Sequence, residues 1–318
     1  MSDHPKVVAI GGGSGLSNLL RGLKYYPVGI SGVVTMTDNG ASSGRLSREL
    51  GILPPGDVRK CLAALSNDEQ LMTKLFEYRF QKGRGISGHS LGNLLLLALT
   101  EITGDFEQAV QASSKILAIR GEVIPSSLEH VSIVAELKNG QQALGEKEIP
   151  IQGHRFGLSG VRILPENAKA NPRAIYFIEN ADLIVFGPGS LYTSIIPSLL
   201  IKDIRHALEK SSAMKVFVCN VSTERGETEN YTVESHLKAL KDSLGGKVKI
   251  DHVLVNSNLK VRSPNQGKLG SINNITTDLE TIGDVKVTKA DLISESSPLY
   301  HDSKKLAEAI WKIITGSC

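Results

Sequence analysis

Cysteine, aromatic residues and long apolar runs are all scarce in this chain, and each scarcity excludes a class of protein. The three cysteines, Cys61, Cys219 and Cys318, are far apart and form no Cys-x-x-Cys pair, so we expect neither a disulfide framework nor a zinc site. Aromatic residues make up 5% of the chain, too few for a surface on which nucleic-acid bases stack. The longest apolar run, residues 94–99, is too short to cross a bilayer.

The chain also lacks an excess of charge of one sign. Its 36 basic and 33 acidic side chains give a formal net charge of +3, which offers no electrostatic reason to expect nucleic acid as a partner. The first residues lead into an apolar, strand-like run without the apolar segment of a signal peptide. We therefore expect a soluble, cytoplasmic protein with no membrane span.

Short apolar runs alternate with helical periodicity along most of the 318 residues. Residues 6–10 predict a buried strand, residues 17–25 a helix and residues 32–36 a second strand, which together make a βαβ unit and imply a parallel sheet. The same reasoning predicts strands within residues 181–200, 215–221 and 252–256, and helices at 58–65 (with Asp57 as N-cap), 71–80, 91–102, from Asn171 onward, 231–244 and 303–315.

Residues 120–165 differ in character from the rest. Residues 131–137 alternate between apolar and polar, and Asn139-Gly140 is a hairpin turn signal. We expect a small antiparallel section here, beside the parallel sheet. With no repeat and no long linker, the whole chain (1–318) is predicted to form a single α/β domain of Rossmann-like type, its sheet flanked by helices.

Three segments after predicted strands carry candidate ligand-binding residues. The first is Gly11-Gly12-Gly13-Ser14-Gly15, where a glycine backbone at a helix N-terminus favours a phosphate group. It is not a dinucleotide fingerprint, because Leu16 stands where the third glycine belongs, and it contains no Walker A lysine. The alternative is a tight turn with no ligand.

The second segment, residues 37–50, is predicted to be a polar loop that follows the second strand. Asp38 stands where Rossmann-type folds place the acid that binds a ribose. Hydroxyl, amide and cationic groups surround it and would suit an anion; these candidates are Thr37, Asn39, Ser42, Ser43 and Arg45. An ordinary solvated loop is the alternative.

In the third segment, residues 186–194, another strand ends in a glycine turn. Gly187 and Gly189 flank a proline, and Ser190 is placed to cap the next helix. Two such turns in one sheet indicate a ligand across the carboxyl ends of the strands. Tyr192 is expected either over a base or sugar or in the core.

Ser90 lies in Gly-His-Ser-Leu-Gly, which matches the G-x-S-x-G pattern of a hydrolase nucleophile elbow. That motif needs a buried strand before the serine, whereas residues 81–87 are polar and interrupted by glycines. We therefore interpret this stretch as a loop that leads into a helix, with Ser90 and Asn93 in its first turn.

Taken together, several motifs resemble those of the YvcK family, known as gluconeogenesis factors. They are VVAIGGGSGLSNLLRGLK, TDNGASSGRL, PPGDVRKCLAALS, GHSLGNLLLLAL, VFGPGSLYTSIIPSLL and NVSTERGETENYT, in this order from about residue 6 to residue 235. This family is grouped with the 2-phospho-L-lactate transferases in a CofD-like superfamily. The resemblance implies a CofD-like fold and the binding of UDP-sugars such as UDP-N-acetylglucosamine. It also implies a regulatory role that links carbon metabolism to cell-envelope synthesis and cell shape.

The chain departs from the family pattern at two positions. Ala41 replaces a glycine that most members carry, and Tyr300 stands where many members have an arginine before His301. The transferase branch carries Asn-Thr-Gly-Asp-Asp after the second strand, whereas this chain has the YvcK-like form at residues 38–44.

The leading hypothesis is therefore a regulator that binds a nucleotide sugar. The first and third glycine turns with Asn93 would hold the diphosphate, Asp38 a sugar hydroxyl, and Arg45 and Arg59 would neutralise charge. Asp57, Asn220 and Tyr300 complete the candidate set. A transferase for a diphosphate-linked donor, with Mg²⁺ at Asp38 or Asp57, is the rival, and an NAD-dependent oxidoreductase is the third reading. Whether the protein is an enzyme and whether it forms a homodimer are left open.

Overall fold

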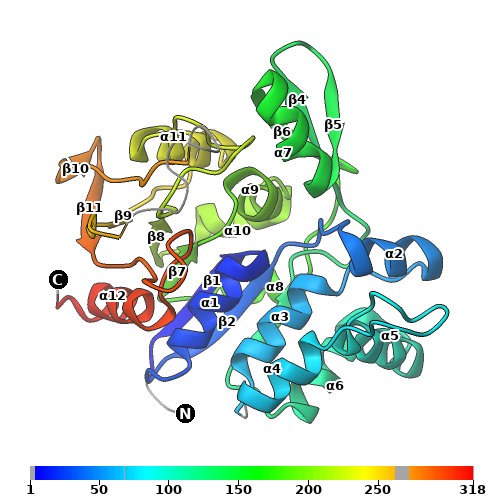
Figure 1. Cartoon of the computed structure of the whole chain (residues 1–318). Coiled ribbons are helices and arrows are strands. Elements are labelled where there is room, and N and C mark those ends of the chain that lie inside the picture. Colours follow the sequence, from blue (N-terminus) through cyan, green and yellow to red (C-terminus); the bar gives the residue numbers. More distant parts are fainter. Residues whose placement is uncertain (1–3, 68, 262–271, 318) are drawn as a thin grey trace.

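The computed structural model describes residues 4–67, 69–261 and 272–317 and contains a main sheet of eight strands (Figure 1). The strand order is β10-β11-β9-β8-β7-β1-β2-β3, and all neighbours are parallel except β10 and β11. The strands are β1 (Lys6–Gly11), β2 (Gly29–Val34), β3 (Glu122–Pro125), β7 (Leu183–Phe186), β8 (Met214–Val218), β9 (His252–Asn256), β10 (Thr281–Ile282) and β11 (Val285–Ala290).

Helices cover both faces of this sheet, as a parallel sheet requires. Successive residues of β1 point to opposite faces, so Val7 and Ala9 pack into one apolar core and Val8 and Ile10 into the other. The first core is covered by α1 (Gly13–Leu23), α3 (Gly56–Leu65), α4 (Glu69–Glu77), α5 (Leu91–Thr103), α6 (Phe106–Ile116) and α12 (Ser303–Thr315). The second is covered by α8 (Pro172–Glu179), the π-helical turn η1 (Leu191–Ile195), α9 (Ile196–Leu199), α10 (Lys202–Lys210) and α11 (Val233–Ser243).

The direction of winding reverses between β1 and β7. The chain leaves β1 through α1 on one face and returns as β2, whereas it leaves β7 through α9 and α10 on the other face and returns as β8. Loops that diverge in this way open a crevice at the carboxyl ends of the two strands, which is where open α/β sheets bind ligands.

The predicted antiparallel section is confirmed as a second, three-stranded sheet that stands out from the main body (Figure 1). Its strands are β4 (Ser132–Leu137), β5 (Gln142–Leu144) and β6 (Leu158–Leu164), with the predicted hairpin between β4 and β5. One helix, α7 (Gly145–Phe156), packs against β4 and was not predicted. Pro150 inside it breaks the helical pattern at the level of sequence.

Most other predicted elements are confirmed within a few residues, and residues 37–50 are the main error. They were predicted to be a loop, but Ala41–Leu50 forms helix α2, which ends at Gly51 in the left-handed conformation. Serines and glycines disfavour a helix in isolation. Tertiary packing overrides that preference here, since Ser42, Ser43 and Leu46 are all buried.

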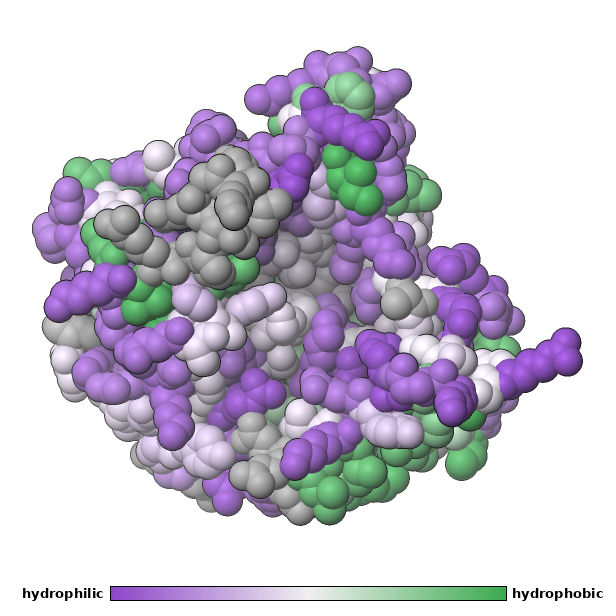
Figure 2. Space-filling view, viewed as in Figure 1, coloured by the Kyte–Doolittle hydropathy of each residue, from purple (hydrophilic) through white to green (hydrophobic). Residues whose placement is uncertain are grey.

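No helix among the described residues is long and apolar enough to cross a membrane. Hydrophilic residues cover most of the face shown in Figure 2, and a group of hydrophobic residues lies along its lower edge, over α4 and α6.

Candidate functional site

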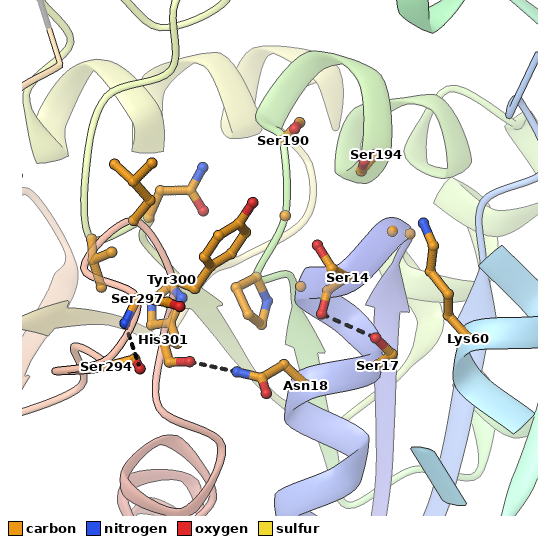
Figure 3. Close-up of a pocket in the computed structure, with 18 of the residues that line it drawn as sticks. Ser14, Ser17, Asn18, Lys60, Ser190, Ser194, Ser294, Ser297, Tyr300 and His301 are labelled. Atoms are coloured by element: carbon orange, nitrogen blue, oxygen red, sulfur yellow. Dashed lines mark hydrogen bonds between the residues drawn. The ribbon is translucent and has the colours of Figure 1, made fainter. Parts of the chain in front are cut away.

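A cleft of about 630 Å³ lies where the winding reverses, at the carboxyl ends of β1, β7 and β8 (Figure 3). Its walls come from the start of α1, the turn after β7, the loop after β8 and the segment 294–301, with single side chains from α3 and α4. Of the candidate residues, those in the cleft are Gly12, Gly13, Ser14, Gly15, Gly189, Ser190, Asn220 and Tyr300.

The first glycine turn presents backbone N–H groups to the cleft. Gly13 has φ +64°, a left-handed conformation that favours glycine, and it begins helix α1. The first hydrogen bond of the helix runs from the N–H of Leu16 to the oxygen of Gly12, so the amides of Ser14 and Gly15 have no acceptor within the helix. This arrangement suits an anionic group.

Asp57 already occupies one amide of this turn. Its carboxylate accepts a hydrogen bond from the N–H of Gly13 and contacts the Nζ of Lys60 at 2.9 Å. Asp57 lies in the first turn of α3, which begins at Gly56, so the prediction that Asp57 caps this helix is wrong. Its side chain instead connects α3 to α1.

The two predicted glycine turns do meet at the sheet edge. A Cβ on Gly15 would lie 2.4 Å from the carbonyl oxygen of Pro188, so only glycine allows this contact. Ser190 follows this turn but does not cap the next helix with its side chain, because its Oγ donates to Oε1 of Glu224 at 3.1 Å. Ser190 is therefore the N-cap residue by position, as predicted, but its side chain makes no capping hydrogen bond and connects the turn to the loop after β8.

Two cationic side chains line the cleft, Arg21 from α1 and Lys60 from α3. Burial lowers the pKa of Lys60, but the carboxylates of Asp57 and Asp38 raise it more, so the ammonium group stays charged. Sequence reasoning missed both residues. A signal for Arg21 was present, because Ser14, Asn18 and Arg21 recur at the spacing of one helical face.

Neither of the predicted arginines lines this cleft. Arg45 donates from Nε to Nε2 of His89 at 2.8 Å and from a terminal nitrogen to the oxygen of Ser87. Arg59 is buried and donates to the oxygen of Phe76 at 3.2 Å. Arg45 and Arg59 thus lie outside the lining of this cleft, and both guanidinium groups donate to other parts of the chain.

The other candidates after β2 form a separate polar cluster. Thr37 donates to Oε1 of Glu146 at 2.9 Å, and Asn93 donates to Ser42 and Ser43. Asp38 accepts from the N–H of Gly40, and burial followed by the charge of Asp57 raises the pKa of Asp38. Several candidates do not line the cleft; these are Gly11, Thr37, Asp38, Asn39, Ser42, Ser43, Asp57, Asn93, Gly187 and Tyr192.

Ser90 is the N-cap of α5, and its Oγ accepts a hydrogen bond from the N–H of Asn93. Turns and bends fill residues 81–88, so no strand leads into the serine. Ser90 is fully buried. The structure thus confirms the capped helix and excludes a nucleophile elbow.

The two candidate tyrosines have different surroundings. Tyr192 pairs its hydroxyl with that of Tyr231 at 2.7 Å and packs against the apolar core, as the core alternative predicted. Tyr300 lines the cleft and is 54% exposed. In Figure 3 it lies across from Lys60, with Ser14 between them.

The C-terminal segment is fixed to α1 and to the first residue after β8. Asn18 donates from Nδ2 to the backbone oxygen of His301, and Nε2 of His301 lies 3.2 Å from the oxygen of Cys219. Burial lowers the pKa of His301 to about 4, so the imidazole is neutral. These contacts hold Tyr300 at the edge of the cleft.

The expectation of Mg²⁺ at Asp38 or Asp57 can be compared with the side chains present. Within residues 4–67, 69–261 and 272–317, no group of three or more His, Cys, Asp or Glu side chains is arranged to hold a metal ion. Lys60 already contacts Asp57, so the positive charge at this point comes from the chain itself. Mg²⁺ at Asp38 or Asp57 stays a prediction, because this cation is usually held by one or two carboxylates together with the phosphates of a ligand.

Comparisons with known proteins agree on one group of relatives. A sequence model of the family described as 2-phospho-L-lactate transferase CofD matches residues 7–293. The chain is 44% identical over 98% of its length to the gluconeogenesis factor of Bacillus subtilis, of which it covers 98%. It is 42% identical over 96% of its length to the gluconeogenesis factor of Halalkalibacterium halodurans, of which it covers 95%. A crystal structure of a Bacillus halodurans protein matches 97% of this chain and 100% of its own, with a TM-score of 0.89 and 41% identity.

Proposed function

Because the chain belongs to the CofD family, and within it to the gluconeogenesis factors, we propose that it binds a UDP-sugar in the cleft between β1 and β7. We propose further that it acts in the cytoplasm as a regulator that links gluconeogenesis to cell-envelope synthesis and cell shape. UDP-N-acetylglucosamine is the ligand that the family resemblance suggests.

One observation carries the ligand class. The cleft brings together the N-terminus of α1, where the amides of Ser14 and Gly15 have no acceptor within the helix, and the two cations Arg21 and Lys60. Helix N-terminal amides and nearby positive charges are the groups that bind a diphosphate. A single phosphate would leave much of a cleft of about 630 Å³ empty, whereas a nucleotide sugar has groups on both sides of its diphosphate.

Tyr300 offers a place for the base. Its ring is half-exposed at the edge of the cleft, and it has a neighbouring apolar side chain in Leu299. An aromatic ring of this kind stacks on a planar base.

A transferase acting on a diphosphate-linked donor is the second candidate, because the matching family model takes its name from such an enzyme. Two features support the regulator instead. The chain has Asp38-Asn39-Gly40-Ala41-Ser42 where that branch carries its Asn-Thr-Gly-Asp-Asp element, and a buried group of side chains holds residues 37–43. An NAD-dependent oxidoreductase has less support, since Asp38 does not line the cleft.

A thermal-shift panel tests the proposal with UDP-N-acetylglucosamine, UDP, GDP, NAD and the deazaflavin Fo, each with and without Mg²⁺. A ligand at 100 times its Kd stabilises the folded protein by about 2.7 kcal/mol. We expect UDP-N-acetylglucosamine to raise the unfolding midpoint more than NAD or Fo does. A shift with NAD alone would replace the proposal with the oxidoreductase. Turnover of a GDP-linked donor with Fo would replace it with the transferase.

A further inference from the structure

The π-helical turn η1 separates the cleft already described from a second cleft of about 570 Å³. Ser190, at the start of this turn, and Ser194 line the first cleft, whereas Tyr192 and Ile196 line the second. Residues two apart on a helical turn do not share a face, so η1 presents one side to each cleft. Single π-helical turns are frequent at functional sites.

The second cleft lies between β6 and the helices α9, α10 and α11, whose places Figure 1 labels. Its floor is apolar, because Val161, Ile196 and Leu200 line it and belong to, or pack against, the apolar core. Its volume falls within the range of about 300–1,000 Å³ that is usual for small-molecule sites. A ligand that fills this cleft therefore needs an apolar part.

Arg205 on α10 brings a positive charge to the second cleft. Among the residues that the structure describes, none accepts a hydrogen bond from its guanidinium group or forms an ion pair with it. The side chain is half-buried, so a ligand can reach it. The other cation in this cleft, Lys238, already contacts Asp242 at 2.6 Å. The unmatched charge of the cleft is therefore that of Arg205.

The two acids on α10 itself have other partners. The carboxylate of Asp203 accepts a hydrogen bond from the N–H of Ala170 at 3.2 Å, and Glu209 lies 3.7 Å from Nδ1 of His206. Arg205 therefore remains available to an acid from outside the chain. A guanidinium group binds a carboxylate through two parallel hydrogen bonds, which a neutral ligand cannot reproduce.

A pair of tyrosines adds a further hydrogen-bond donor. Tyr192 and Tyr231 both line the second cleft and are partly exposed, and their hydroxyl oxygens lie 2.7 Å apart. One hydroxyl proton lies between the two oxygens, which leaves the other to donate elsewhere. The described part of the chain supplies no second acceptor for it. The cleft thus combines spare donors, one positive charge and an apolar floor.

We propose that the second cleft binds a small organic acid, with its carboxylate on Arg205 and its apolar part on the floor formed by Val161, Ile196 and Leu200. This inference goes beyond the proposed function and does not depend on it, because no residue that lines the second cleft also lines the first.

NMR titration with three compounds tests the inference. Cinnamate has a carboxylate and an apolar part, cinnamamide has the same shape without the charge, and acetate has the charge without the apolar part. We expect cinnamate to bind the wild type about tenfold more tightly than either of the others, because only cinnamate uses both Arg205 and the floor.

Two variants separate the two parts of the site. In Arg205→Gln we expect affinity for cinnamate to fall about tenfold and affinity for cinnamamide to stay the same. Leu200→Ala removes part of the floor and should weaken both compounds alike. Arg155→Gln is the matched control, because Arg155 is an exposed arginine on α7 that lines neither cleft.

Three results would overturn the inference. They are a wild type that does not bind cinnamate, equal wild-type affinities for cinnamate and cinnamamide, and a loss of cinnamate binding in Arg21→Gln but not in Arg205→Gln, which would place the acid in the first cleft. If Arg205→Gln does not fold, the wild-type preference and the Leu200→Ala titration decide the question. None of these results changes the proposed function, which the thermal-shift panel tests separately.

Discussion

At the scale of single residues, the cleft depends on backbone groups that only glycine leaves accessible. Gly13 lines the cleft with φ +64°, and the nearest atom to a Cβ placed there would be Oγ of Ser194 at 3.7 Å. A side chain at this position has room but projects into the space where the amides of α1 would meet a phosphate. A side chain at Gly13 would therefore have two effects, on the access of a phosphate to the amides and on the strain of the left-handed backbone, and the two can be tested separately.

Gly13→Val should reduce nucleotide-sugar affinity by about tenfold or more, because the branched side chain would block approach to the helix N-terminus. It should also reduce the free energy of unfolding by about 1–2 kcal/mol, the cost of a left-handed conformation for a residue with a Cβ. Gly51→Val is the control, because Gly51 has φ +66°, no atom within 4 Å of its Cβ position and no place in the cleft. Equal affinities in the two variants would show that the first turn is structural only.

Tyr300 lines the cleft, and the family resemblance implies an arginine at this position in many members. Tyr300→Arg should tighten UDP-sugar binding, because a guanidinium group makes charge-assisted, bidentate contacts with a diphosphate. The gain should shrink as salt increases, since salt screens exposed charges. Tyr300→Ala should weaken binding by about 0.5–1.5 kcal/mol, the worth of one stacked aromatic ring.

Calorimetry at low and high salt measures both effects. Tyr78→Arg supplies the control, because Tyr78 is as exposed as Tyr300, at 54%, and lies outside the cleft. Unchanged affinity in both Tyr300 variants would place the base of the ligand elsewhere.

At the scale of elements, α1 joins the glycine turn to the C-terminal segment. Its N-terminus faces the cleft, Asn18 in its second turn holds the backbone of His301, and Gly22 in its last turn lies against α12. A Cβ on Gly22 would lie 2.1 Å from the oxygen of Ser303 and 2.7 Å from the Cβ of Ala307. The distance between α1 and α12 therefore fixes where Tyr300 lies.

This contact reverses the usual effect of a glycine-to-alanine change in a helix. In an unpacked helix interior the change stabilises by about 0.5–1 kcal/mol. In Gly22→Ala we expect a loss of about 1–3 kcal/mol instead, because the methyl group overlaps the backbone of α12. Urea unfolding measures the change, and a gain in stability would mean that α12 moves aside freely. A weaker affinity for the nucleotide sugar should accompany the loss, because Tyr300 moves with α12.

At the scale of the whole molecule, the site is held at a cost in stability. Glu227 is buried and Glu146 and Glu224 are half-buried, and desolvation raises the pKa of all three carboxyl groups. A carboxyl group with a raised pKa in the folded state stabilises fully below its unfolded pKa. That contribution is lost as the pH rises through the folded value.

Glu224 gives the clearest pH window, from its ordinary value of 4.5 to about 8. The free energy of unfolding of the wild type should therefore fall between about pH 5 and pH 8, and it should fall less in Glu224→Gln. At pH 8 the glutamine variant should be more stable by about 1–3 kcal/mol, because it buries no ionisable group. Urea unfolding of both proteins at three pH values measures the difference in their free energies of unfolding. The contributions of His301 and the other titrating groups are common to both proteins and cancel in this difference. Parallel curves would show that Glu224 is not the group that titrates.

The sequence by itself determined the elements that depend on local pattern. Apolar runs predicted β1, which is stopped by glycine, and β9, and N-cap chemistry predicted the starts of α5 and α8. It also determined that the glycine turns after β1 and β7 meet, because the carboxyl ends of parallel strands share one edge. The ordered motifs indicated the family, which the comparisons confirm.

Only the tertiary structure decided which polar residues share the cleft. Arg21, Lys60 and Glu224 come from three separate segments, and nothing in the local sequence of Lys60 or Glu224 distinguishes them from exposed charges. The polar residues after β2 were predicted to form a loop, yet Ala41–Leu50 folds as α2, with Ser42 hydrogen-bonded to Asn93, and Thr37 before it is hydrogen-bonded to Glu146. The physical reason is that a polar side chain satisfies its hydrogen bonds equally well with a ligand or with another part of the chain. Local sequence fixes its chemistry, and the packing of distant segments fixes its partner.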